Sequence, residues 1–564
     1  MRIFKSIGVV GLALGLLTAC GTTKTATSSA ASELKIITAT DSVKAKTAEL
    51  TEVELQNWPA DDIFKDSIPG LSLDKAYQFV KDKTATPVIV GVIDSGIDIE
   101  HEDLKDVAWT NEDEIPGNGK DDDKNGYIDD VHGWNFLGGE EGQANPEQLE
   151  LTRIVKKWKP RFEGVTPENV AEADKADYEL YQELIKTIDD KRSNATNIVA
   201  RYTLIKDMIN TTNDTIVKSL DGKAMGLNNL NGLHFEDQGL EQGKLVIMQI
   251  LDQGATVDEA IAELDDYMNH YKTQLNSQYN VDFSGRVAGD NPYDITDTVY
   301  GNPFIIGSKD DEMHGTHVAG IIAAKRNNGI GMNGVADHVK IMSVRAVPDG
   351  DEYDKDVALA IRYAVNNGAK VINMSFGKSY SPNAQWVYDA IKYAAAKDVL
   401  LVHAAGNDSA DIDIDNNFPN DSSDKITEFA DNVITVGAMT RLFDDNLVAS
   451  FSNYGKKNVD VFAPGLEIYS TVPKDKYEFL QGTSMASPEV AGVAALVRSY
   501  YPKLTASQVK HILMNSGIEF KGEVIKPGAA EDDNKELFTN LSVSGHIVNA
   551  YNALLMADNL SRKK

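Results

Sequence analysis

Three short segments of the chain carry side chains that could together perform nucleophilic catalysis. Asp94 ends a β-branched run, His314 lies in the segment MHGTHVAG, and Ser484 lies in GTSMASP. A serine hydroxyl becomes an effective nucleophile when a histidine takes its proton and an aspartate orients that histidine. Each residue also has a structural interpretation, as a turn or helix cap for Asp94, a hydrogen-bonded core residue for His314 and a helix cap for Ser484. Their occurrence together, in the order Asp, His, Ser, favours a catalytic triad.

Two further segments strengthen this interpretation. VHAAGND contains Asn407, and NMSFG contains Ser375. Together with the three segments above, they resemble the subtilisin-like serine peptidases, the subtilases, over residues 74–120 and 307–552. The resemblance implies a serine endopeptidase that acts through an acyl-enzyme, with the Asn407 amide and the Ser484 backbone N–H stabilising the tetrahedral oxyanion. The alternative is a catalytically silent relative that serves as a binding module.

The same resemblance implies which residues line the substrate cleft. They form two groups, each directly after a predicted strand: Met374, Ser375, Phe376 and Gly377, then Ala404, Ala405 and Gly406. Phe376 departs from the leucine that is commoner in the family. His317 lies on nearly the same helical face as His314, and we expect it to have a structural role.

A scaffold must hold these residues together, and the hydrophobic pattern predicts an α/β fold. Apolar runs such as TPVIVGVIDSGID, VKIMSVRAV, AKVINMSFG and VLLVHAAGN alternate with amphipathic segments such as VALAIRYAVNNG. This alternation predicts a mainly parallel sheet with helices on both faces, the three-layer arrangement of subtilisin-like proteins. Asp94, Ser375 and Asn407 then fall at the carboxyl ends of strands, where ligands of such sheets bind. The expected chemistry needs no cofactor.

The pattern changes between Asp94 and His314, which are farther apart than in typical subtilases. Apolar residues recur there at three- and four-residue spacing, as in ADYELYQELIKTIDD and VDEAIAELDDYMNHYKTQL. We therefore predict a catalytic domain in two parts, 51–138 and 299–558, separated by an α-helical insertion at 139–298. Residues 559–564 are assigned to a C-terminal tail.

An acidic loop ahead of the predicted insertion, GNGKDDDKNGYIDDVHGWNF, suggests a structural calcium ion. Its spacing resembles an EF-hand loop, although His132 stands where that loop has a bidentate glutamate. The alternative is an Asx-rich turn without metal. Asp103 matches a calcium ligand of some subtilases, and zinc is not expected because HExxH and paired-cysteine motifs are missing from the sequence. The expected calcium ligands are Asp121, Asp123, Asn125, the Tyr127 carbonyl, Asp129 and Asp130.

The pattern of the first residues is typical of a signal peptide for export. Arg2 and Lys5 precede an apolar run, and LTAC ends at Cys20, the only cysteine of the chain. This resembles a bacterial lipobox, which predicts a signal peptide at 1–19, lipid attachment at Cys20 and a flexible tether over 20–50. The expected location is a bacterial membrane, on the outer membrane or cell surface.

The overall charge restricts the partners. The 564 residues include 55 Lys plus Arg against 86 Asp plus Glu, a formal net charge of −31. Such a charge opposes binding to phosphate backbones, so nucleic acid is not an expected partner. The expected partners are protein or peptide substrates and, through the lipid anchor, the membrane.

Overall fold

The computed structural model describes residues 43, 45, 46, 48–139, 142–310, 312–529 and 534–562. Within these residues, 151–284 form one compact helical unit, and the rest form a second unit that contains the predicted active site, here called the catalytic unit. The predicted signal peptide and Cys20 lie outside the described residues. Val43, Ala45 and Leu50, within the range predicted as a tether, pack against the core of the catalytic unit.

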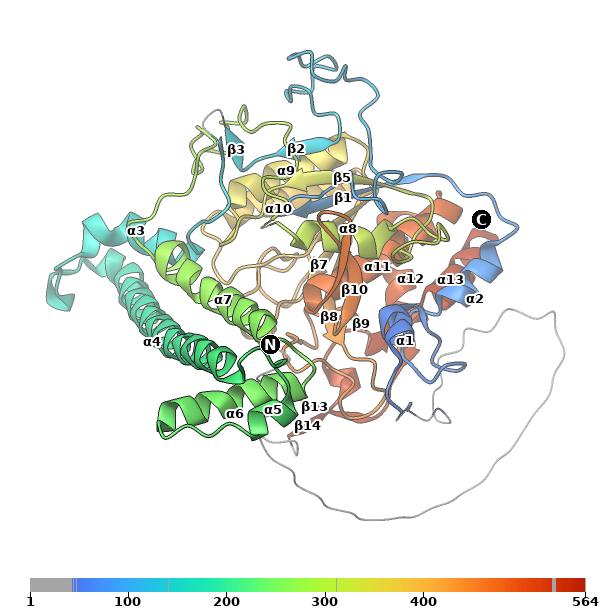
Figure 1. The fold of residues 1–564 in the computed structure, drawn as a ribbon. Coiled ribbons are helices and arrows are strands. Elements are labelled where there is room, and N and C mark those ends of the chain that lie inside the picture. Colours follow the sequence, from blue (N-terminus) through green and yellow to red (C-terminus); the bar gives the residue numbers. More distant parts are fainter. Residues whose placement is uncertain are drawn as a thin grey trace. The chain divides into compact units, whose positions relative to one another are not determined.

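The catalytic unit is built on a nine-stranded sheet (Figure 1). Neighbouring strands are parallel except β12 and β15, which confirms the predicted mainly parallel α/β fold. In sheet order the strands are β12 (Ile518–Glu519), β15 (His546–Ile547), β9 (Val461–Pro464), β8 (Val433–Met439), β7 (Leu400–Ala404), β6 (Val371–Met374), β1 (Val88–Asp94), β5 (Val339–Arg345) and β2 (Gly133–Asn135).

Helices cover both faces of this sheet because its central strands are apolar on both sides. Val90 and Val92 of β1 belong to one hydrophobic cluster, and Ile93 belongs to another. Such doubly buried strands are typical of parallel sheets. The first cluster includes residues of α2 (Leu73–Val80), α8 (His314–Ala323), α11 (Thr483–Tyr500), α12 (Ala506–Ser516) and α13 (Ala550–Arg562), and the second includes residues of α9 (Asp354–Asn366) and α10 (Ala384–Ala396).

Smaller elements complete the catalytic unit. Among the described residues the first helix is α1 (Glu52–Asn57), and the last, α13, extends through Arg562, so residues 559–562 of the predicted tail are helical. Three antiparallel strand pairs lie outside the main sheet: β3 (Gly138–Gly139) with β4 (Gly142–Gln143), β10 (Ile468–Val472) with β11 (Lys476–Leu480), and β13 (Glu523–Ile525) with β14 (Lys535–Leu537).

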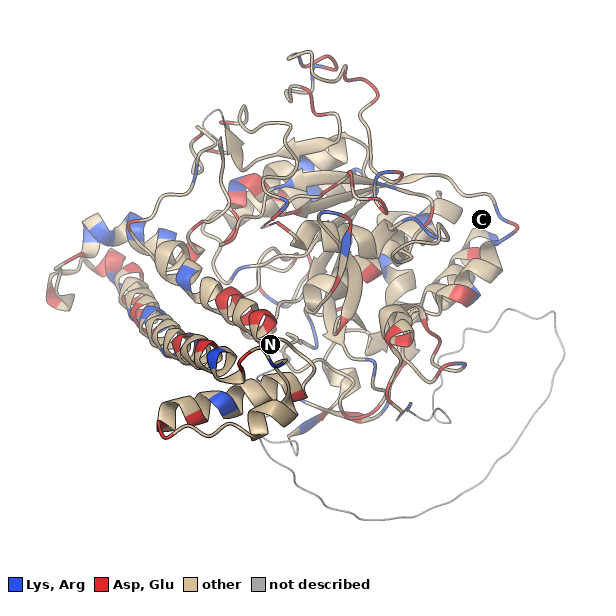
Figure 2. Cartoon of the chain, in the orientation of Figure 1, with Lys and Arg blue, Asp and Glu red and all other residues tan. Residues whose placement is uncertain are grey.

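The helical unit has a core of its own. Ile209, Ile216, Ile247 and Leu264 are buried in one cluster formed by the three longest helices of the unit. Figure 2 marks acidic residues in red and basic residues in blue along α4 and α7. Nowhere in the described part of the chain is a helix both long and apolar enough to cross a bilayer. The helices are α3 (Glu150–Phe162), α4 (Lys175–Leu220), α5 (Leu227–Asn231), α6 (Gln238–Asp252) and α7 (Val257–Thr273).

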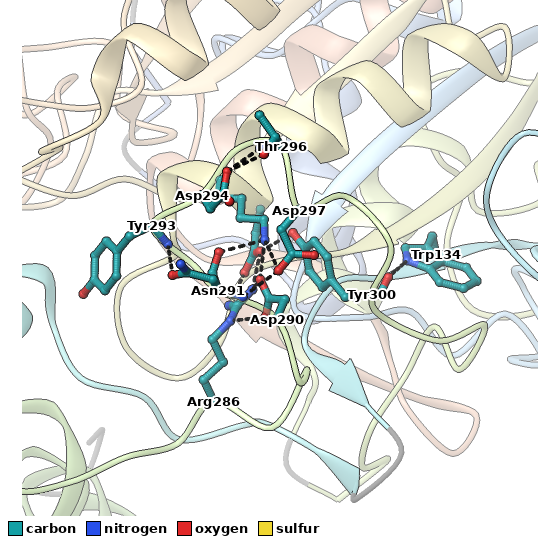
Figure 3. A network of polar contacts seen from close by, with 11 residues as sticks. Trp134, Arg286, Asp290, Asn291, Tyr293, Asp294, Thr296, Asp297 and Tyr300 are labelled. Atoms are coloured by element: carbon teal, nitrogen blue, oxygen red, sulfur yellow. Dashed lines mark hydrogen bonds and ion pairs between the residues drawn. The ribbon is translucent and has the colours of Figure 1, made fainter.

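A buried ionic network fixes residues 286–300 within the catalytic unit (Figure 3). Arg286 contacts Asp290 at 2.6 Å and Asp356 of α9 at 2.8 Å. Lys355, also on α9, contacts Asp290 at 2.6 Å, and the Tyr300 hydroxyl donates to Asp356 at 2.6 Å. The side chains of Asp290, Asp356 and Lys355 are fully buried. Burial removes the hydration of each charge in this network, so attraction to its oppositely charged partners must offset the desolvation penalty.

We predict that Asp356→Ala lowers the free energy of unfolding by about 3–5 kcal/mol, because the Arg286 guanidinium would stay buried without its partner. The measurement is urea denaturation of protein carrying Ser484→Ala. Asp190→Ala is the matched control, since the Asp190–Lys186 pair is exposed and its loss should have little effect. Equal stability of the two variants would contradict the importance of the network.

Candidate active site

Asp94 and His314 meet at the carboxyl edge of the sheet. Asp94 is the last residue of β1 and is 1% exposed, while His314 is the first residue of α8. His314 Nδ1 donates to Asp94 Oδ1 over 2.7 Å, and the Ser95 N–H donates to the same oxygen over 2.8 Å. This contact leaves Nε2 as the nitrogen able to take a proton from a nucleophile.

A buried arginine links the segments that carry these two residues. Arg345 lies opposite Asp94 in the pairing of β5 with β1. Its Nε donates to the Ser95 carbonyl over 2.8 Å and to Glu312 Oε2 over 3.0 Å, and both charged side chains are buried. Glu312 precedes His314 by two positions, so Arg345 connects the residue after the aspartate to the start of α8. The sequence pattern does not indicate this pairing, although Arg345 is a charged residue at the end of the apolar run VKIMSVR.

Gly315 allows α8 to begin close to the aspartate loop. A Cβ atom at this position would lie 2.3 Å from the Gly96 carbonyl oxygen and 3.2 Å from Asp94 Cβ. A side chain there would force α8 away from the loop. The glycine of HGTH therefore contributes directly to the contact between His314 and Asp94.

Ser484 lies in the first turn of α11, which is attached to the end of β6. The Ser375 hydroxyl donates to the Ser484 carbonyl over 2.8 Å, and the Ser487 hydroxyl donates to Asn373 Oδ1 over 2.8 Å. The Ser484 hydroxyl itself donates to the Ser375 carbonyl over 3.2 Å. These bonds place the serine at the carboxyl edge of the sheet, the same edge where β1 ends.

Asn407 and the Ser484 backbone border one small space. Thr483 donates to Asn407 Oδ1 from its backbone N–H over 2.9 Å and from its hydroxyl over 3.1 Å. These two donors identify the amide atom that faces Thr483 as the oxygen. A Cβ atom at Gly482, whose φ is +149°, would lie 3.4 Å from Asn407 Nδ2 and 3.5 Å from the Ser484 nitrogen. The Asn407 Nδ2 and Ser484 nitrogen atoms thus both lie within 3.5 Å of one point at a helix N-terminus, a position suited to an oxyanion.

The pKa values of the two histidines of HGTH are shifted in opposite directions. Although desolvation of the ring opposes protonation, the Asp94 carboxylate holds the pKa of His314 above its ordinary value. Burial instead lowers the pKa of His317 to about 3. His317 Nε2 donates to the carbonyls of Ile468 and Glu478, each over 3.1 Å. A neutral His317 thus connects α8 to the β10–β11 hairpin.

The predicted substrate-binding segments continue from the ends of adjacent parallel strands. Met374 ends β6 and Ala404 ends β7. The side chains of Met374 and Ala405 are fully buried, so they face the core, and only their backbones could contact a substrate. His403 Nε2 donates to the Phe376 carbonyl over 2.8 Å, and burial lowers the pKa of His403 to about 4. The other predicted residues are Ser375, Gly377 and Gly406, the last with a φ of +101°.

The acidic loop separates its predicted metal ligands into two groups. Asp121 accepts backbone N–H groups of Asn125 and Gly126, and Asp129 accepts those of Asn118 and Gly119. The Asn125 oxygen accepts the Tyr127 N–H. These three side chains therefore shape the turn, and the Asn125 amide also connects it to Asp123 and Asp130, to which its Nδ2 donates over 3.0 and 3.1 Å.

One carboxylate oxygen each of Asp123, Asp130 and Glu114 lies within 4.8 Å of the others. Glu114 is not among the metal ligands expected from the sequence. Burial raises the pKa of Asp130 to about 6. Asp103, the other predicted ligand, is buried and accepts hydrogen bonds from Asn328 Nδ2 and the Met332 N–H.

Comparison with known proteins relates this site to a characterised family. The profile of Peptidase_S8, the Subtilase family, matches residues 85–542. The chain is 42% identical over 209 residues to the thermophilic serine proteinase of Bacillus sp. (strain AK1), covering 37% of this chain and 46% of that protein. It is 39% identical over 225 residues to subtilisin DY of Bacillus licheniformis, covering 39% of this chain and 76% of that protein. The chain thus spans less than half the length of the first relative.

We predict that Asp94→Asn lowers kcat by about 10⁴-fold, because the imidazole loses its orienting acceptor and the stabilisation of its charged form. Since neutral His314 is the base, activity falls as the pH drops through its pKa. The asparagine removes the carboxylate that raises this pKa, so the acid limb of kcat should move to lower pH. Asp106 is exposed, so Asp106→Asn is the control. An acid limb of kcat at the same pH in the parent, Asp94→Asn and Asp106→Asn would contradict the role assigned to Asp94.

Proposed function

The chain belongs to the subtilase family, and from this premise we propose that it is a serine endopeptidase that cleaves peptide bonds within protein substrates. The observation that carries the proposal is the 2.7 Å contact between His314 and Asp94 at the sheet edge that also bears Ser484 and Asn407. Each of the four residues has a chemical role in such a reaction. A catalytically silent binding module would not require these four side chains at one sheet edge.

The reaction begins when the Ser484 hydroxyl turns from the Ser375 carbonyl towards His314 Nε2. Oγ forms a bond to the scissile carbonyl carbon while its proton passes to Nε2, and the carbonyl electrons move to oxygen. Asn407 Nδ2 and the Ser484 N–H stabilise the resulting oxyanion. Asp94 remains ionised and stabilises the imidazolium.

Collapse of the tetrahedral intermediate breaks the C–N bond. The amine leaves with the proton from His314 Nε2, and the acyl group stays on Ser484 as an ester. Water then attacks this ester with His314 as base, and the second collapse returns the proton to Oγ. No cofactor takes part in these steps.

Substrate backbone binding is assigned to the chain that follows β6 and β7. Ser375, Phe376 and Gly377 would provide one edge for an extended peptide, and Ala404 to Gly406 the other. The buried side chains of Met374 and Ala405 limit the role of these two residues to backbone contacts and support of the cleft wall. The proposed substrates are therefore proteins or peptides able to adopt an extended conformation.

We also propose that Cys20 anchors the protein to a bacterial membrane after export, at the outer membrane or cell surface. The proposal rests on the LTAC segment and the apolar run before it. Cys20→Ser should move the protein from the membrane fraction to the soluble fraction while its peptidase activity is retained. Equal membrane association of both forms would refute the lipid anchor.

The activity is tested with a fluorogenic peptide blocked at both termini, which an exopeptidase cannot cleave. We predict that Ser484→Ala lowers kcat by about 10⁶-fold and Asn407→Ala by about 10²- to 10³-fold, with little change in KM. Asn446 is exposed, so Asn446→Ala is the matched control and should leave kcat unchanged. Cleavage by Ser484→Ala at the parent rate would refute the proposed nucleophile.

A further inference from the structure

Lys378 follows directly after the segment assigned to substrate backbone binding, and its side chain is buried. Its ammonium nitrogen lies 2.9 Å from Glu150 Oε2, 2.8 Å from Asp354 Oδ1 and 2.7 Å from the Glu352 carbonyl oxygen. An ammonium group has three N–H donors, so these oxygens match its donors in number. The side chains of Lys378, Glu150 and Asp354 are 2%, 5% and 3% exposed. Because a buried charge is costly away from its partners, the lysine is held in this one position.

The carboxylates around Lys378 belong to parts of the chain that are themselves fixed. Asp354 begins α9 and accepts the Ser381 hydroxyl over 2.7 Å. Glu150 is the last residue before the helical unit, and its N–H donates to Asp351 Oδ2 over 2.7 Å. Lys378 therefore connects the substrate segment both to the start of α9 and to the point where the insertion begins.

Gly377, the residue before Lys378, has an open backbone. It is exposed, and in the described part of the chain neither its N–H nor its carbonyl forms a hydrogen bond with another residue. Its neighbours are fixed. The Phe376 carbonyl accepts His403 Nε2 over 2.8 Å, while the Lys378 N–H and carbonyl pair with Phe418 over 3.0 and 2.9 Å. An exposed donor and acceptor between two fixed residues can pair with the backbone of an extended peptide.

The position of Gly377 relative to the proposed nucleophile decides which part of a substrate it would contact. The Ser484 hydroxyl donates to the Ser375 carbonyl over 3.2 Å, so Ser375 lies beside the scissile bond. Two residues of chain span up to about 7 Å, which is the farthest that Gly377 can lie beyond Ser375. An extended peptide therefore reaches the Gly377 backbone, whereas a substrate with a single amino-acid residue ends near Ser375.

We infer that Lys378 is a positioning residue for substrate binding, an inference that rests on the proposed peptidase activity. The lysine does not contact the reacting atoms. It holds the Gly377 backbone where an extended peptide can pair with it, and Glu150, at the start of the insertion, helps to hold the lysine. Loss of this support leaves the chemistry intact and weakens the binding of long substrates.

The test compares a fluorogenic peptide blocked at both termini with the p-nitrophenyl ester of an N-acetylated amino acid. For Lys378→Met we expect the KM of the peptide to rise about tenfold, because one or two backbone hydrogen bonds of ordinary strength correspond to that factor. The kcat for both substrates and the KM of the ester should stay near the parent values. Lys244→Met is the matched control, since Lys244 is also buried and donates to Glu241 and the Leu233 carbonyl within the helical unit.

Glu150→Ala is a second variant, in which Lys378 keeps Asp354 as its partner and the buried charges stay compensated. We expect a smaller rise in the KM of the peptide, again without a change for the ester. Labelling of Ser484 by a fluorophosphonate at the parent rate shows that a variant is folded, and Glu150→Ala alone decides the question if Lys378→Met does not fold. The inference is overturned if the labelled variants keep the parent KM for the peptide, or if the KM of the ester rises as much. Failure of the parent to cleave either substrate would instead refute the peptidase activity.

Discussion

The proposed catalytic arrangement depends on the hydrogen bond between His314 Nδ1 and Asp94 Oδ1, which joins residues separated by 220 positions. Such a bond requires β1 to end and α8 to begin at the same point in space. Parallel strands satisfy this requirement because their carboxyl ends lie along one edge, with each connecting segment returning across a face. The sheet is therefore the first condition for the chemistry.

Three local features bring this contact within hydrogen-bond distance. Arg345 contacts the loop after Asp94 and the segment before His314 in a buried position. Gly315 has no side chain that would separate α8 from Gly96. On the other side, His317 is held neutral and connects α8 to the β10–β11 hairpin. The imidazole of His314 is thus fixed by neighbours that take no part in the reaction.

Sequence alone predicted the α/β fold, because this fold follows from local pattern. The parallel sheet followed from apolar runs alternating with amphipathic segments, and Asp94, His314 and Ser484 were selected from short motifs. The contacts of Arg345 with Glu312, and of Glu114 with Asp130, depend on chain segments that meet after folding, so no local spacing predicts them. The burial of Met374 and Ala405 has a similar cause, since each side chain is covered by a hydrophobic cluster formed from several elements. Residues 559–562 continue α13, whose amphipathic pattern exceeds the predicted boundary.

Covalent labelling can establish whether Ser484 is a nucleophile activated by His314. A fluorophosphonate reacts with an activated serine hydroxyl and leaves a phosphonyl group that peptide mapping by mass spectrometry can locate. We expect a single adduct on the peptide containing Ser484, formed by the folded protein and much more slowly by His314→Ala. A folded protein without an adduct, or with its adduct on another residue, would show that Ser484 is not the activated nucleophile.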